Sequence, residues 1–124
     1  MEGPYEKGMR VRREVLGDAH VDQAVAATTK LDESFQRWIT ESVWGTLWAN
    51  PDLDRKTRSL VTLAILTALV RPNQLRGHVR GALANGATPE EIREVLLHTV
   101  DYAGIPAGVE AFAAAAEVLK ERRP

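Results

Sequence analysis

The sequence predicts an all-α protein, a single-domain helical bundle of about six to seven helices with no sheet. Helix-start and helix-stop residues recur along the chain, and no segment alternates polar and apolar residues as a strand would. The chain has 124 residues, 44% of them hydrophobic, which is enough for one core. We therefore expect residues 1–124 to form one domain, with 1–8 as a loosely ordered N-terminal tail.

The expected helices follow one another with short connections. Thr88 offers an N-cap hydroxyl, Pro89 suits the first helical position, and Glu91 can reach back to the cap amide. Gly104 can take the left-handed conformation that ends this helix. The helix over 55–70 is apolar on nearly every side, so we expect it at the centre of the bundle. The expected helices cover residues 9–16, 21–27, 34–49, 55–70, 73–85, 89–103 and 106–120.

The expected helix over 34–49 has large apolar groups on two faces. Phe35 and Val43 lie along one stripe, and Glu41, Trp44 and Trp48 lie along roughly the opposite one. A helix in a monomer has one core to face. We therefore expect the tryptophan stripe to be covered by a second subunit, by a ligand pocket, or by both.

Composition excludes several classes of function. The formal net charge of −1, with acidic and basic residues interleaved, argues against nucleic-acid binding. The chain has no cysteine, which excludes disulfides, thiolate nucleophiles and Cys-ligated zinc. The N-terminus lacks the apolar region of a secretory signal, and threonines interrupt the longest apolar run, residues 60–70. We expect a cytoplasmic protein that contacts neither membrane nor nucleic acid.

Absent motifs narrow the chemistry further. The sequence holds no Walker loop, no GxGxxG, no GxSxG nucleophile elbow and no HExxH. The four lysines lie in segments that read as exposed, which argues against a buried Schiff-base lysine. Histidine, carboxylate and arginine side chains remain as the candidates for catalysis.

His78 is the first catalytic candidate. It lies in the expected helix over 73–85, beside the apolar stripe that contains Val79. Gly77 and Gly81 leave room for a ligand next to the ring, at a cost of roughly 1 kcal/mol of helix propensity per glycine. The alternative is a core histidine bonded to a backbone carbonyl, and the position of His78 alone leaves both interpretations open.

His98 is the second candidate, at the edge of the buried stripe of the helix over 89–103. Glu94 and Asp101 lie within one turn of it, so a structural ion pair is an alternative to acid-base catalysis. Glu94 and His98 could also hold a metal, but two ligands are too few for a site, and we expect none. His20 is interpreted as a cap or interface residue.

Glu41 and Arg58 complete the candidates that follow from the residues alone. Glu41 shares its stripe with two tryptophans, and apolar surroundings would keep a carboxyl group protonated, as a general acid requires. A solvated ion pair with Arg37 is the alternative. Three cations crowd the first turn of the helix over 55–70, where the helix dipole disfavours them, so an anionic ligand for Arg58 is a reasonable hypothesis.

Five segments together resemble the 4-carboxymuconolactone decarboxylase family, and the resemblance runs from about Arg10 to Lys120. The segments are Val15–Asp22 (VLGDAHVD), Ile39–Thr46 (ITESVWGT), Arg58–Ala64 (RSLVTLA), His78–Arg80 (HVR) and His98–Pro106 (HTVDYAGIP). The resemblance implies an all-α fold of the alkylhydroperoxidase-like type, assembled as a homotrimer or homohexamer. Relatives with peroxidase activity carry a C-x-x-C pair before a histidine. Here those positions are Arg71 and Gln74, so peroxidase activity through that motif is excluded while His78 is retained.

The resemblance also implies a reaction, the decarboxylation of 4-carboxymuconolactone to the β-ketoadipate enol-lactone in aromatic (protocatechuate) catabolism. The substrate is a small lactone dicarboxylate whose own ring accepts the electrons, so no cofactor is needed. For this reaction we expect Arg58 to bind a substrate carboxylate and His78 to donate the proton or stabilise the oxyanion. His98 and Glu41 are second catalytic candidates, Trp44 is a candidate pocket wall, and Arg80 is a weaker substrate-binding candidate on a different helix face.

Two rival functions remain open at this point. The same scaffold could form a non-catalytic oligomeric protein that binds a carboxylated small molecule. It could also be a related enzyme that acts on a different lactone or keto acid.

Overall fold

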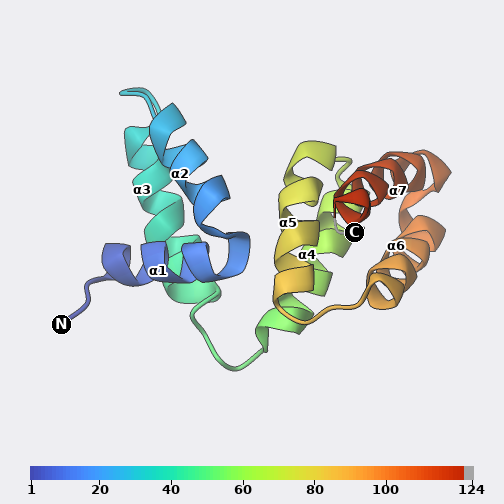
Figure 1. The fold of residues 1–124 in the computed structure, drawn as a ribbon, viewed down its shortest axis with the longest axis horizontal. Helices are drawn as coiled ribbons and strands as arrows, with labels where there is room; N and C mark the ends of the chain where they lie inside the picture. The colour runs from blue at the N-terminus through green and yellow to red at the C-terminus, as the bar shows by residue number, and fades with distance from the viewer. Residues whose placement is uncertain (122–124) are drawn as a thin grey trace. The chain divides into compact units, whose positions relative to one another are not determined.

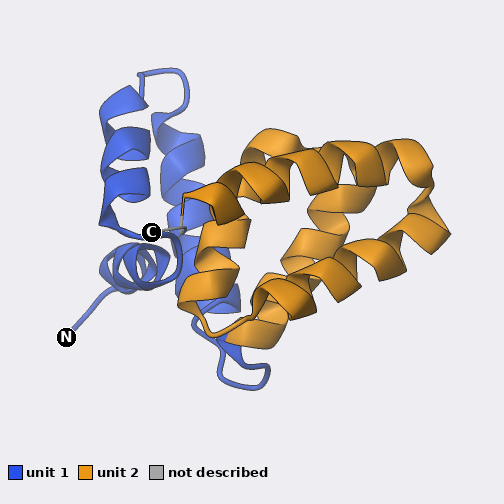
Figure 2. Cartoon of the chain, turned by 45° about the vertical axis from the view of Figure 1, so that its right-hand side comes forward, with its two compact units in different colours: residues 1–55 blue, residues 56–124 orange. Residues whose placement is uncertain are grey.

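The computed structural model describes residues 1–121, and within them the chain forms seven α-helices, one π-helix and no strand (Figure 1). The all-α prediction is confirmed. These residues divide into two compact units, one of residues 1–55 and one that begins at Lys56 (Figure 2). None of the helices in this part of the chain is both long and apolar enough to cross a membrane.

Unit 1, residues 1–55, contains α1 (Pro4–Leu16), α2 (Asp18–Ala27), α3 (Glu33–Ile39) and the π-helix η1 (Thr40–Leu47). Gly17 separates α1 from α2 with a φ of 92°, a conformation that glycine adopts without strain. The expected loose tail over 1–8 is wrong from Pro4 onward, because Pro4 lies in the first turn of α1 and Gly8 is buried. A proline in the first turn costs no hydrogen bond and favours the helix start.

The expected helix over 34–49 is α3 followed directly by η1. The Trp48 N–H donates to the Val43 carbonyl at 2.9 Å, the i to i−5 bond of a π-helix. Helix α1 crosses η1 with almost no space between the two backbones, since a Cβ atom on Gly8 would collide with the Thr40 carbonyl. A Cβ on Gly45 would lie 2.8 Å from the Pro4 carbonyl oxygen. Glycine at both positions therefore permits the crossing.

The tryptophan stripe of this segment is covered from within unit 1, so the prediction that a subunit or ligand covers it is wrong. Trp44 and Trp48 are each 5% exposed, stack with ring centroids 5.2 Å apart, and pack with Val11 and Val15 of α1. The reason is that α1 starts earlier than expected and lies across this face. The exposed aromatic residue of the segment is instead Trp38, 72% exposed.

Unit 2 contains most of α4 (Arg55–Ala68), and α5 (Pro72–Ala84), α6 (Pro89–Ala103) and α7 (Ile105–Lys120). The predicted capping box is confirmed, because the Glu91 N–H donates to Thr88 Oγ1 at 3.0 Å and the Thr88 N–H donates to the Glu91 carboxylate at 2.9 Å. Gly104, with a φ of 105°, ends α6 and precedes α7 as expected.

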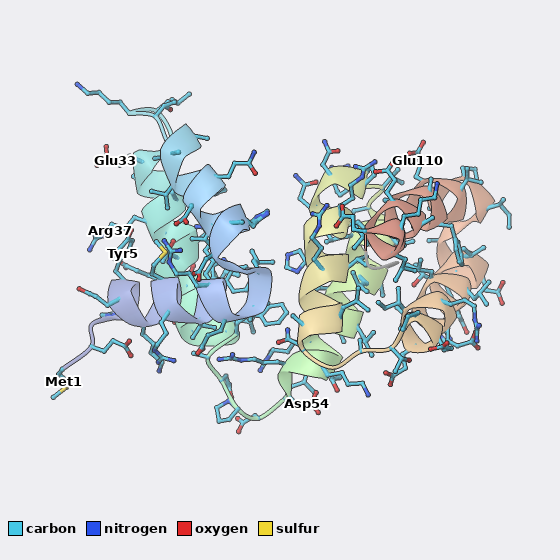
Figure 3. The ribbon with its side chains drawn as sticks, viewed as in Figure 1. Met1, Tyr5, Glu33, Arg37, Asp54 and Glu110 are labelled. Atoms are coloured by element: carbon cyan, nitrogen blue, oxygen red, sulfur yellow. The ribbon has the colours of Figure 1, made fainter. Side chains whose placement is uncertain are left out.

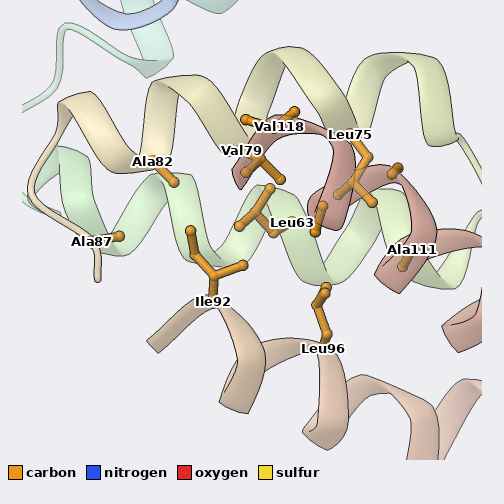
Figure 4. Close-up of a cluster of buried hydrophobic side chains, with 11 residues drawn as sticks. Leu63, Leu75, Val79, Ala82, Ala87, Ile92, Leu96, Ala111 and Val118 are labelled. Atoms are coloured by element: carbon orange, nitrogen blue, oxygen red, sulfur yellow. The ribbon is translucent and has the colours of Figure 1, made fainter. Parts of the chain in front are cut away.

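The core of unit 2 is aliphatic and draws on all four helices (Figure 4). Leu63 of α4 is 0% exposed, and Leu75 and Val79 of α5 are 1% and 0% exposed. Alanines of α7 bring that helix close to the others. The cluster consists of Leu63, Leu75, Val79, Ala82, Ala87, Ile92, Leu96, Ala111, Ala114, Ala115 and Val118.

Helix α4 buries only one stripe, so its expected place at the centre of the bundle is wrong for this chain alone. Ser59, Leu63 and Thr67 are its buried residues. Val61 and Ile65, on its other side, are 47% and 52% exposed. A unit of four helices has one core, and each helix turns one face toward it. An apolar face of α4 is therefore left uncovered in the single chain.

Candidate active site

Three of the six predicted site residues lie on three consecutive helices of unit 2. Arg58 is on α4, His78 on α5 and His98 on α6. Glu41 and Trp44 are on η1 in unit 1. Arg80, the sixth, also lies on α5.

His78 lies half-buried beside the core of unit 2, with its Nδ1 atom buried. The neighbours Gly77, Val79 and Gly81 are all buried. This agrees with the expected position of the ring, along or beside the buried face. A half-buried imidazole retains access to a ligand on one side and is held by packing on the other, as a positioned acid or base requires.

His98 lies in an apolar groove of about 230 Å³ between α4 and α6. Its ring stacks on Tyr102 with centroids 5.4 Å apart. No ion pair joins His98 to a carboxylate within residues 1–121, and Glu94 pairs instead with Arg93 at 3.1 Å. The ion-paired interpretation of His98 is therefore wrong in the described chain. The groove is lined by Thr57, Leu60, Val61, Ala64, Val95, His98 and Thr99.

Two of the cations at the start of α4 pair with carboxylates that are distant in sequence. Arg55 pairs with Glu14 at 3.2 Å, and Lys56 pairs with Glu91 at 2.7 Å. The Lys56 hydrogen bond, aided by the Thr88 amide, holds the pKa of Glu91 below its usual value. Arg58 is half-buried, with its Nε atom buried. Thr57, the residue before it in the chain, lines the His98 groove.

Arg80 is exposed and pairs with Glu121 through two contacts, of 2.9 and 3.1 Å. This hydrogen bonding lowers the pKa of Glu121 and raises the pKa of Arg80. Both residues line a shallow pocket of about 300 Å³ with residues of α5 and α7. A guanidinium already held by a carboxylate is a weaker ligand for a substrate anion, which agrees with the lower rank given to Arg80.

Glu41 is half-buried and forms an ion pair with Arg37 at 2.9 Å, which is the alternative that the sequence left open. It lines a pocket of about 270 Å³ with Pro4, Trp38, Ser42 and Thr46. The structure thus surrounds Glu41 with surface residues rather than with the stacked tryptophans. Trp44 packs in the core of unit 1, and its role as a pocket wall stays a prediction.

The sequence reasoning missed Arg12, which is 6% exposed and lines a pocket of about 280 Å³ in unit 1. The signal was present, because Gly8, Val11, Arg12 and Val15 follow the spacing of a buried helix stripe and Arg12 is the one charged residue among them. Figure 3 labels three other residues of this pocket, Tyr5 on α1 and Glu33 and Arg37 on α3.

These side chains allow acid-base chemistry on an anionic substrate. Imidazoles can donate or accept a proton, and half-buried guanidinium groups can hold carboxylates. Among residues 1–121, no group of three or more His, Asp or Glu side chains is arranged to hold a metal ion.

Comparison with known proteins gives a consistent set of relatives. Residues 33–117 match the profile of the Carboxymuconolactone decarboxylase family. The chain is 43% identical over 120 residues, 97% of its length and 90% of the relative's, to a 4-carboxymuconolactone decarboxylase of Acinetobacter baylyi. It is also 43% identical over 107 residues, 86% of its length and 75% of the relative's, to a nitrosuccinic acid decarboxylase of Metarhizium robertsii. A 4-carboxymuconolactone decarboxylase of Pseudomonas putida is 46% identical over 41 residues, 33% of this chain and 85% of the relative.

Proposed function

Because the chain belongs to the carboxymuconolactone decarboxylase family, we propose that it is a carboxy-lyase that converts 4-carboxymuconolactone to the β-ketoadipate enol-lactone and CO2. The observation that carries this proposal is the 43% identity to a relative of that name across 97% of the chain. The available histidine, carboxylate and arginine side chains suit such a reaction. A substrate of this kind requires anion binding and one proton transfer.

The reaction divides into bond cleavage and protonation. The bond between the γ carbon and its carboxylate breaks, CO2 leaves, and the electron pair moves through the ring double bond into the lactone carbonyl. The resulting dienolate then takes one proton at the carbon next to that carbonyl. The substrate is its own electron sink, so the protein must hold a dianion, stabilise the oxyanion and supply the proton.

We assign these tasks to residues of unit 2 first. Arg58 binds a substrate carboxylate, and His78 donates the proton or stabilises the oxyanion. The half-buried positions of both side chains support this assignment, since a partly desolvated charge interacts more strongly with a bound ion. His98, in its apolar groove, is the second candidate for proton transfer. Glu41 ranks below both because Arg37 already pairs with it.

We further propose that the chain acts as a homo-oligomer, a trimer or a hexamer. The support is apolar surface that a single chain leaves open. Ile65 of α4 is 52% exposed and Trp38 of α3 is 72% exposed. An apolar groove of about 300 Å³ also lies between α6 and α7, with Leu97, Ile105 and Phe112 among its lining residues. Light scattering on the purified protein should give three or six times the mass of the chain, and a monomer at micromolar concentration would contradict this.

Nitrosuccinate is the second candidate substrate, favoured by the similarity to the Metarhizium robertsii enzyme. Nitrosuccinate also carries two carboxylates, and its nitro group can accept the electron pair that CO2 leaves behind. The two substrates therefore require the same tasks of the protein. We place the lactone first because the relative named for it covers more of the chain, 97% against 86%.

The direct test is an assay of CO2 release by the purified protein with each substrate in turn. We expect turnover of the lactone with a higher kcat/KM than turnover of nitrosuccinate. A reversed ratio would assign the chain to the second substrate. Ligand-induced thermal stabilisation with no CO2 from either substrate would indicate a non-catalytic binding protein and overturn the proposal.

The replacement His78→Ala should lower turnover of the lactone at least about tenfold, because general acid-base groups contribute at least that much. The helical circular dichroism should stay unchanged, since His78 is only half-buried. His98→Ala is the matched variant on α6. Wild-type turnover by His78→Ala together with a large loss in His98→Ala would transfer the role of proton donor to His98.

A further inference from the structure

Unit 1 buries a cation for which the described chain supplies no counter-ion. The Arg12 side chain lies in the stripe by which α1 packs on η1, and the residue is 6% exposed. Its Nη1 atom donates to Gln36 Oε1 at 3.3 Å and to Thr40 Oγ1 at 3.4 Å, both long and both to neutral acceptors. Its Nε atom is buried with no hydrogen-bond partner. No carboxylate lies within ion-pair distance of this guanidinium in residues 1–121, whereas Arg10 and Arg13 on the same helix each pair with acidic residues.

An uncompensated buried guanidinium is costly. A lysine or histidine in such a place can lose its proton, but arginine stays charged. Burial lowers the pKa of Arg12, which shows that the charged form is disfavoured where it lies. Natural proteins pair buried charges with an opposite charge, so the missing anion calls for an explanation.

The guanidinium lines a pocket in which an anion can bind. The pocket has a volume of about 280 Å³ and lies among α1, the end of α2, α3 and the first residue of η1. Its wall combines apolar side chains with hydroxyl and amide groups that can bond a polar ligand. The lining residues are Tyr5, Met9, Arg12, Val25, Thr28, Glu33, Gln36, Arg37 and Thr40.

The charges around the pocket favour an anion of charge −1. Arg37 is already neutralised by Glu41 at 2.9 Å, so Arg12 is the cation left to balance. Glu33, exposed among the lining residues, adds a negative charge and makes no ion pair with either arginine in the described chain. One carboxylate balances one guanidinium and matches its planar donor geometry, while a phosphate dianion would leave an excess of negative charge.

We propose that this pocket in unit 1 binds the carboxylate group of a small organic acid, with the Arg12 guanidinium as its counter-ion. The apolar side chains of Met9 and Val25 face the carbon skeleton of such a ligand, and Tyr5 and Thr28 offer hydroxyl groups to further polar atoms. The proposal rests on the burial and contacts of Arg12, and it does not depend on the decarboxylation proposed above.

The test measures binding of the monocarboxylate butyrate to the full chain by calorimetry, with butyramide as the neutral analogue. Butyrate should bind to the wild type and butyramide should not. Arg12→Met should weaken butyrate binding at least about tenfold, as expected for loss of a charge-assisted contact. Arg10→Met is the matched control, because it removes the same charge from the exposed face of the same helix, and it should bind butyrate as the wild type does. Glu33→Gln should bind at least as tightly as the wild type.

Three outcomes would overturn the proposal. The first is equal butyrate affinity in the wild type and in Arg12→Met. The second is equal or tighter binding of inorganic phosphate, which would make the site one for a general anion. The third is no butyrate binding to the wild type, and a change of oligomeric state in Arg12→Met would then assign the counter-ion to a second copy of the chain. Should Arg12→Met fail to fold, Arg12→Lys keeps the charge, loses the planar fork, and is predicted to bind more weakly than the wild type.

Turnover and binding distinguish this proposal from the proposed reaction. Butyrate binding that depends on Arg12, in a protein that releases no CO2 from the lactone, would leave the pocket assigned and the reaction refuted. Lactone turnover together with carboxylate binding that Arg12→Met leaves unchanged would support the reaction and refute the assignment of the pocket.

Discussion

The two units of the chain build their cores by opposite means. Unit 1 brings backbones together, with Gly8 against the Thr40 carbonyl, and fills the remaining space with two stacked tryptophans. Unit 2 packs aliphatic side chains, with Leu63 and Val79 fully buried. Unit 1 also buries the charged Arg12, while the buried polar residues of the described part of unit 2, Ser59, Thr67 and Thr99, carry uncharged hydroxyl groups.

The two cores should therefore tolerate different kinds of substitution. A core of aliphatic side chains loses stability when atoms are removed, because a cavity remains. A crossing held at backbone contact loses stability when atoms are added, because neither backbone can move aside. All three tryptophans, at positions 38, 44 and 48, lie in unit 1, so tryptophan fluorescence reports on that unit while far-UV circular dichroism reports on both.

The largest effect on stability is expected from Leu63→Ala in unit 2. The side chain is 0% exposed, and its loss should lower the free energy of unfolding by about 3 kcal/mol. Urea titration followed by circular dichroism measures this. The control is Leu31→Ala, the same replacement at a residue that is 92% exposed, with an expected change below about 0.5 kcal/mol.

The same titrations test whether the units are separate in stability. For Leu63→Ala we expect the tryptophan fluorescence midpoint to shift less than the circular dichroism midpoint. Equal shifts would show that both cores unfold as one, and the contrast between the units would then be one of packing only.

Gly8→Ala should lower the free energy of unfolding by about 2 to 3 kcal/mol, because the added methyl group meets the Thr40 backbone. Gly108→Ala is the matched variant in unit 2, where the added Cβ would meet the Val100 side chain instead. We expect it to cost about 1 kcal/mol, since a side chain can shift. Urea titrations followed by fluorescence and circular dichroism measure both losses. An equal loss of unfolding free energy in Gly108→Ala and Gly8→Ala would contradict the explanation by backbone contact.

Acid should weaken unit 2 slightly more than unit 1. The pKa of Glu91, Glu117 and Glu121 in unit 2, and of Glu2 in unit 1, is held below the ordinary 4.5 mainly by hydrogen bonds from lysine or arginine. A carboxylate with a lowered folded-state pKa stabilises the fold above the unfolded pKa, and this contribution is lost as the pH falls through the folded value. The effect should be small because these groups are exposed, and salt should reduce it.

Thermal melts at pH 7 and just below pH 4 measure this difference. The circular dichroism midpoint should fall more than the tryptophan fluorescence midpoint. A larger fall in fluorescence would mean that the acid-sensitive pairs are those of unit 1.

Much of the fold was predictable because its determinants are local. The capping box at Thr88 and the glycine at position 104 specify helix ends within a few residues, and both are found as expected. The first helix was placed too late because its start depends on Pro4 alone, with no side-chain cap. The π-helix was missed because residues 40–47 follow α3 without a break and were assigned with it to one α-helix.

The types of the candidate site residues were easier to predict from the sequence than the surroundings of their side chains. The half-buried position of His78 followed from the helical period. The ion pair of Glu41 and the buried tryptophans depended on which helix covers η1, and the sequence does not specify that. Arg12 was overlooked because an arginine is ordinarily assigned to the surface, although its place in the stripe indicated otherwise.

The proposed carboxy-lyase reaction is tested most directly by turnover of 4-carboxymuconolactone in D2O, with CO2 and product followed together by NMR against an enzyme-free blank. We expect enol-lactone formation well above the blank, one deuterium at the carbon next to the carbonyl for each CO2 released, and a rate at least about tenfold lower in His78→Ala. Folded, oligomeric protein that releases no more CO2 than the blank would contradict it.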